Sequence, residues 1–133
     1  MGISAYFKKN IRPAVTAARV NSREMYLAYK SQAEKLVRGK VGRFNGFYKF
    51  EFHRISIRNQ KTRWGSCSSR GNLNFNYKII FLPDQMADYI VAHELCHLKE
   101  MNHSRRFWDL VARTIPDYKI IKKDLRRKGI ALS

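Results

Sequence analysis

The spacing of apolar residues predicts a long helix in the first third of the chain. Apolar side chains recur at helical intervals between Ser22, a plausible N-cap, and Asn45-Gly46, two residues that tolerate the left-handed C-cap conformation. These apolar positions are Tyr26, Tyr29, Ala33, Leu36, Val37, Val41 and Phe44. We therefore predict a helix with one buried face over residues 22–46.

Alternation of apolar and polar residues then predicts two strands. In residues 47–59 the apolar parity shifts between Phe52 and Ile55, which indicates a bend or bulge. Residues 72–82 alternate without a break and predict a half-buried strand. We expect the two segments to belong to a small antiparallel sheet.

Three more helices are predicted after the strands. Pro83 favours the start of a helix that runs to about residue 99, Ser104 is a cap for residues 105–114, and a basic helix covers residues 118–129. An N-terminal helix, a small sheet and three further helices make an α+β chain.

The length and net charge of the chain indicate its number of domains and the kind of partner it could bind. A chain of 133 residues suits one domain, so we assign residues 22–133 to a single domain and leave residues 1–21 as an N-terminal segment of uncertain structure. The formal net charge of +17, from 27 Lys+Arg against 10 Asp+Glu, attracts polyanions and favours nucleic acid as a partner. Solvation of helix faces by lysine explains the same charge without a partner.

The expected location is the cytoplasm. Two cysteines, Cys67 and Cys96, do not make a disulfide framework and favour a reducing compartment. The N-terminal sequence has no apolar segment typical of a signal peptide, and no run approaches the roughly 18 apolar residues of a membrane span. We expect no contact with a membrane.

The helix predicted after Pro83 is mostly apolar but carries His93, Glu94 and His97. The two histidines lie one turn apart on one face, the arrangement that two imidazole ligands of a tetrahedral ion need. Glu94 is rotated by about 100° and can flank the ion as a general base. Burying these groups without partners would cost on the order of several kcal/mol. The pattern therefore predicts one bound Zn²⁺, with Glu94 as the catalytic residue.

His103 is the leading candidate for a third ligand. A continuous helix would carry it out of reach, so we expect the helix to end near residue 99 and the chain to reverse, with Asn102 in the left-handed conformation. Asp109 on the following helix is the alternative ligand. His53, the remaining histidine, is interpreted as a core residue.

Several blocks of the sequence resemble one protein family. They are Arg63–Cys67, Leu82-Pro83, His93–His97, Asn102–Ser104 and Phe107-Trp108. The chain resembles the YgjP-type metallopeptidase domain, a relative of the SprT-like and minigluzincin zinc proteases, from roughly Tyr29 to Gly129. This resemblance implies a zincin fold with His93, His97 and His103 as ligands and Glu94 as the base.

The same resemblance implies a role near the cleft for the segment around Trp64 and Cys67. We expect both residues in the core; Cys67 as an inhibitory fourth ligand is the alternative. Arg63 is a further candidate for the cleft, where it would polarise a carbonyl group.

The predicted function is zinc-dependent hydrolysis of peptide bonds. Asn74 and Asn76 are candidate cleft residues, because strand 72–82 could pair as an edge with an extended peptide. Two alternatives are a zinc-dependent hydrolase of nucleoside triphosphates, although no glycine-rich phosphate loop is present, and a non-catalytic nucleic-acid-binding module. Protein substrates held on nucleic acid would fit both the protease chemistry and the charge.

Overall fold

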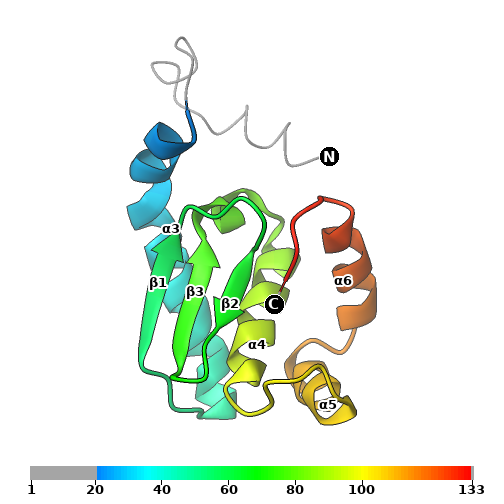
Figure 1. The fold of residues 1–133 in the computed structure, drawn as a ribbon. Coiled ribbons are helices and arrows are strands. Elements are labelled where there is room, and N and C mark those ends of the chain that lie inside the picture. The colour runs from blue at the N-terminus through cyan, green and yellow to red at the C-terminus, as the bar shows by residue number, and fades with distance from the viewer. Residues whose placement is uncertain (1–20, 133) are drawn as a thin grey trace.

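The computed structural model describes residues 21–132 and confirms the α+β class (Figure 1). Residues 1–20, nearly all of the predicted N-terminal segment, lie outside the described part. The elements are α3 (Ser22–Tyr48), β1 (Arg54–Arg58), β2 (Gly65–Cys67), β3 (Asn72–Asn76), the 3₁₀ helix η1 (Tyr77–Phe81), α4 (Asp84–His97), α5 (Arg105–Thr114) and α6 (Tyr118–Arg126). None of the described helices is long and apolar enough to span a membrane.

The predicted first helix is present, but both of its caps differ from the prediction. The N-cap is Asn21 rather than Ser22, because the Asn21 side chain accepts a hydrogen bond of 2.8 Å from the backbone N–H of Glu24. At the other end α3 continues to Tyr48, and Lys49 takes the left-handed conformation. Asn45 lies inside the helix, where its side-chain amide exchanges two hydrogen bonds with the backbone of Phe50 and fixes the exit.

The sheet is mixed, not antiparallel as predicted. Its order is β1-β3-β2, with β1 parallel to β3 and β2 antiparallel to β3. The strands β1 and β2 run in opposite directions and do not pair with each other, because β3 lies between them and pairs with both. The central position of β3 could not be inferred from the period of the sequence, which carries no information on strand order.

Both predicted strands are also shorter than the alternation suggested. Within residues 47–59 only β1 forms a strand. Phe47 and Tyr48 belong to the end of α3, and residues 49–53 are irregular. Residues 77–81 form η1 because the Asn76 side chain accepts from the backbone N–H of Lys78 at 3.0 Å and starts a turn. The apolar side chains of this turn, Tyr77, Ile79 and Phe81, are nevertheless buried as expected.

Helix α4 is the most enclosed element of the described chain. It lies with α3 behind the sheet, while α5 and α6 pack on its other side (Figure 1). Residues 89–97 of α4 are all buried. This position explains why the helix is apolar on every side, and it places His93, Glu94 and His97 in the interior.

The buried side chain of Lys40 connects the two long helices through two ion pairs, one with the exposed Asp84 and one with the largely buried Asp88. Its Nζ lies 2.6 Å from a carboxylate oxygen of Asp84 and 2.6 Å from one of Asp88, both on α4. Burial on its own lowers the pKa of Lys40, but hydrogen bonds and attraction from the two carboxylates outweigh it and raise the pKa above its usual value. The ammonium therefore keeps its charge at neutral pH and ties α3 to the first turns of α4.

Replacing Lys40 with alanine is expected to lower the free energy of unfolding by about 1–3 kcal/mol, because the largely buried Asp88 keeps only its longer contact of 3.6 Å with Arg43. Arg38→Ala is the matched control. Arg38 pairs with Glu34 on the exposed side of α3, and its loss should cost about 0.5 kcal/mol or less. Urea unfolding followed by circular dichroism measures both; equal losses would contradict the assignment of Lys40.

Candidate metal centre

Three histidine side chains converge at the end of α4. The Nε2 atom of His97 lies 3.2 Å from that of His93 and 3.1 Å from that of His103, and the Nε2 atoms of His93 and His103 are 3.4 Å apart. Nitrogen ligands at ~2.0–2.1 Å from a tetrahedral ion lie about 3.3–3.4 Å from one another. The three nitrogen atoms therefore have the spacing that a single metal ion requires.

Contacts at the opposite ring nitrogens orient two of these imidazoles. The Nδ1 atom of His97 lies 3.0 Å from the backbone oxygen of Glu100, which can only accept, so Nδ1 carries the proton and Nε2 presents a lone pair to the cluster. The Nδ1 atom of His93 lies 3.2 Å from the hydroxyl of Tyr89. Such outer contacts are typical of metal-binding histidines, because they fix the tautomer and the ring orientation.

A short corner brings His103 back to the helix. Helix α4 ends at His97, slightly before the predicted position, and the Ser104 side chain caps α5 by accepting from the backbone N–H of Phe107. Asn102 is not left-handed as predicted: among described non-glycine residues only Lys49 has a positive φ. The alternative ligand Asp109 is exposed and lies outside the three-histidine cluster.

Two aromatic residues at the start of α5 support the cluster. The buried Phe107 ring stacks on the imidazole of His97 with centroids 4.4 Å apart, and Trp108 lies nearly parallel to the ring of His103 at 5.7 Å. Neither residue was predicted to have a role in the site. The available signal was their position three and four residues after the Ser104 cap, which places them in the first turn beside His103.

Glu94 is fully buried and packs against β2. A Cβ atom at Gly65 would lie 3.1 Å from Cγ and 3.2 Å from Oε2 of Glu94, and 3.0 Å from the backbone oxygen of Asn74. A side chain at position 65 would therefore require the Glu94 side chain or the neighbouring strand to shift by a few tenths of an ångström. Glycine at this position allows Glu94 to lie directly over the sheet.

The neighbouring Trp64 is buried, as predicted, but Cys67 is only half-buried. Burial and the negative charge of Glu94 raise the pKa of the Cys67 thiol to about 11. This shift favours the protonated thiol at neutral pH, and Cys67 does not belong to the histidine cluster. The prediction for His53 is wrong, because its side chain is exposed on the segment before β1.

The strand predicted to bind substrate is not an edge. Both sides of β3 are paired, one with β1 and one with β2, so Asn74 and Asn76 cannot present a free backbone edge to a peptide. Asn76 is buried and donates hydrogen bonds to the backbone oxygens of Gln60 and Arg63, while the amide of Asn74 donates to the Ser66 hydroxyl. Arg63 itself is exposed.

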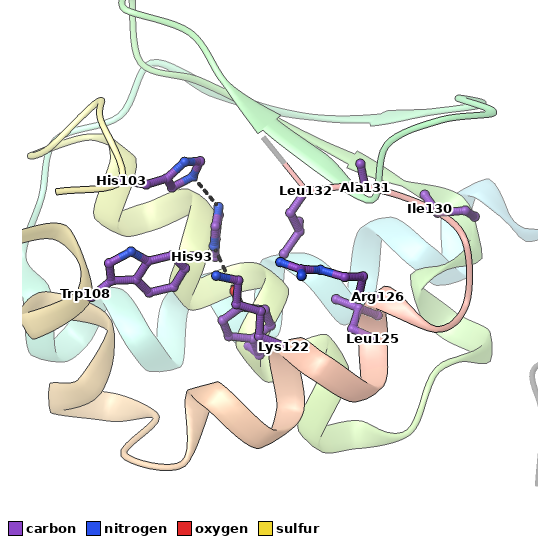
Figure 2. A pocket seen from close by; sticks show the side chains of 10 residues that line it. His93, His103, Trp108, Lys122, Leu125, Arg126, Ile130, Ala131 and Leu132 are labelled. Atoms are coloured by element: carbon purple, nitrogen blue, oxygen red, sulfur yellow. Dashed lines mark hydrogen bonds between the residues drawn. The ribbon is translucent and has the colours of Figure 1, made fainter. Parts of the chain in front are cut away.

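A cavity of about 360 Å³ opens beside His93 and His103 (Figure 2). Its other lining residues are Tyr89, Trp108, Lys122, Leu125, Arg126, Ile130, Ala131 and Leu132. The contributions of α6 and of residues 130–132 were not predicted, because nothing in their spacing relates them to the histidines.

The end of the described chain forms one wall of this cavity. Ala131 accepts a hydrogen bond of 2.8 Å from the backbone N–H of Trp64 and donates one of 3.1 Å to the backbone oxygen of Thr62. These bonds make a parallel bridge between Ala131 and Arg63, directly before β2. Gly129 has a φ of +78°, which lets the chain leave α6 toward this bridge.

The comparisons with known proteins agree with this site. The family model described as "YgjP-like, metallopeptidase domain" matches residues 3–128, which confirms the resemblance and extends it toward the N-terminus beyond Tyr29. Among solved structures, the metallopeptidase zymogen abylysin of Pyrococcus abyssi is similar with a TM-score of 0.63 and 22% identity, over 71% of this chain and 99% of that one. At that identity the likeness concerns the fold. No curated protein matches the chain.

Replacing Gly65 with alanine is expected to lower the free energy of unfolding by about 1–3 kcal/mol, because Glu94 or β3 must shift to admit the methyl group. Gly42→Ala is the matched control. Gly42 lies in α3 with open space around its Cβ position, so alanine there should stabilise the protein by about 0.5–1 kcal/mol. Urea unfolding of the two variants checks the opposite signs, and stabilisation by both substitutions would contradict the packing of Glu94 on Gly65.

Proposed function

The chain belongs to the YgjP-like metallopeptidase family, and on that premise we propose that it hydrolyses peptide bonds with one zinc ion bound by His93, His97 and His103. The observation that carries the proposal is the set of Nε2 separations of 3.1–3.4 Å, together with the Nδ1 contact that fixes the tautomer of His97. Glu94, next to His93 on the buried helix, is the proposed general base.

The donor set favours zinc in a catalytic role. Three imidazole nitrogens suit a borderline ion such as Zn²⁺, and three protein ligands with one remaining position are typical of catalytic sites, whereas structural sites use four. When bound, zinc acidifies a water molecule and polarises the substrate carbonyl. The raised pKa of Cys67 gives no support to that thiol as a fourth ligand.

The role proposed for Glu94 is to move a proton. In this proposal its carboxylate accepts a proton from the attacking water and then donates it to the leaving amine. The side chain lies one residue after His93, rotated away from the ligand face, and its Cγ and Oε2 pack closely on Gly65. Burial of this kind restricts the rotamers of Glu94 and keeps its carboxylate in one orientation.

Purified protein is expected to contain about one zinc ion per chain, since the histidine cluster supplies three ligands for one ion. His103→Ala should lose most of this metal, because only two protein ligands remain. Asp109→Ala should retain it, and so distinguishes His103 from the alternative ligand. Elemental analysis by mass spectrometry measures all three samples; full zinc in His103→Ala would remove that residue from the proposed site.

Glu94→Gln is expected to keep the metal but to lower kcat/KM for peptide cleavage by about 10²–10⁴-fold, because an amide cannot accept the proton. The assay is cleavage of an internally quenched peptide, with zinc content as the control for folding. Unchanged activity in this variant would exclude Glu94 as the base.

The same preparation tests the alternative enzyme. Release of inorganic phosphate or pyrophosphate from nucleoside triphosphates, without cleavage of any peptide, would replace the proposal by the nucleoside triphosphate hydrolase. No further observation favours that alternative or the nucleic-acid-binding module, which rests on the net charge of +17 alone. Nucleic acid as a partner and a cytoplasmic location stay predictions.

A further inference from the structure

Two cations line the cavity beside the histidine cluster. Lys122 and Arg126 lie one turn apart on α6, and Figure 2 shows both side chains pointing from this helix toward His93. Within residues 21–132, neither cation is close enough to an acidic side chain to form an ion pair; the ion pairs found there involve Arg38, Lys40 and Arg43. The cavity is therefore positively charged where it meets the candidate metal centre.

The position of Lys122 distinguishes it from the many solvated lysines of this chain. Its side chain is only partly exposed, and its Nζ lies 4.3 Å from the centroid of the Trp108 ring, which holds the ammonium by a cation–π contact. Burial lowers the pKa of Lys122, and the positive charge of Arg126 lowers it further. An anion in the cavity would offset both effects, because it would attract the two cations.

The remaining walls of the cavity suit a short aliphatic chain. Trp108, Leu125, Ile130 and Leu132 contribute apolar surface to the lining of the cavity. A cavity of about 360 Å³ has room for an amino-acid side chain and the peptide backbone next to it, and its apolar walls and two cations favour a side chain that ends in a carboxylate. Arg126, which is exposed at the rim, can bind such a carboxylate through two parallel N–H groups, while Lys122 contributes a point charge further inside.

We propose that this cavity is a substrate subsite that selects an aspartate or glutamate side chain close to the scissile bond, with Lys122 and Arg126 as its specificity-determining residues. The inference rests on the proposed function, since it assigns a substrate class to the same site. Specificity then arises twice, by attraction of acidic residues and by repulsion of lysine and arginine from the same position.

The test is a set of quenched peptides that differ only at the residues flanking the cleavage site, where glutamate, glutamine or lysine is placed. Wild-type protein loaded with zinc is expected to show a kcat/KM for the glutamate peptide at least about tenfold above that for the lysine peptide. The double variant Lys122→Glu, Arg126→Glu should reverse this order. The control variant Lys119→Glu, Lys123→Glu, an equal change of charge at two exposed positions of α6 outside the cavity, should keep the wild-type order.

Two results would overturn the subsite. One is an equal kcat/KM for the three peptides with wild-type protein. The other is a uniform fall for all three peptides in the folded double variant, which would mean that the cations act on the reaction or the fold rather than on selection. Circular dichroism verifies that the double variant is folded, and if it is not, the single variants Lys122→Gln and Arg126→Gln should each reduce the preference.

A binding measurement separates this inference from the proposed function. Glu94→Gln protein is titrated calorimetrically with the glutamate and lysine peptides at low and high salt. Tighter binding of the glutamate peptide, weakened by salt and abolished by Lys122→Glu, supports the subsite even where no peptide is cleaved. If the wild-type protein cleaves no peptide but this binding preference is present, the proposed reaction is contradicted and the subsite is not. If both peptides bind equally, the subsite is contradicted and the proposed reaction is not.

Discussion

The burial of ionisable side chains in the most enclosed helix is the constraint on which the rest of the structure depends. His93, Glu94 and His97 are each at most 3% exposed, and contacts from α4 itself and from three neighbouring segments hold them in place. The hydroxyl of Tyr89 and the corner after α4 orient the imidazoles, the first turn of α5 packs on them, and a glycine in β2 accommodates the carboxylate. Polar groups in an apolar interior are tolerated only when their surroundings are arranged in this way.

The sequence was most informative where structure depends on local spacing. The pair of histidines one turn apart, the serine cap after them and the need for a reversal between the two were sufficient to predict that His103 returns to the cluster. The buried face of α3 was predicted from the helical spacing of its apolar residues, which is also a local feature. These features are decided within a few residues, so a single chain contains enough information to infer them.

Features that depend on distant parts of the chain were missed. The alternation through residues 72–82 continues across the start of η1, but the strand ends at Asn76, whose side chain is held by the distant backbone oxygens of Gln60 and Arg63 and accepts from the backbone N–H of Lys78. Strand order was invisible for a similar reason: whether a third strand lies beside its predecessor or between two earlier ones depends on packing against α3 and α4. Lys122 and Arg126 were overlooked because a basic helix in a basic chain gives no sign of which cations face a cavity.

The bridge between Ala131 and Arg63 has a consequence for how the molecule is built during translation. A ribosome releases the segments that form the sheet, α3 and α4 before it releases α6 and residues 130–132. A domain generally folds as a unit. Because the bridge joins Ala131 to the segment before β2, the wall of the cavity cannot close until residues 130–132 have been synthesised. A nascent chain therefore contains its candidate ligands before it can close the wall beside them.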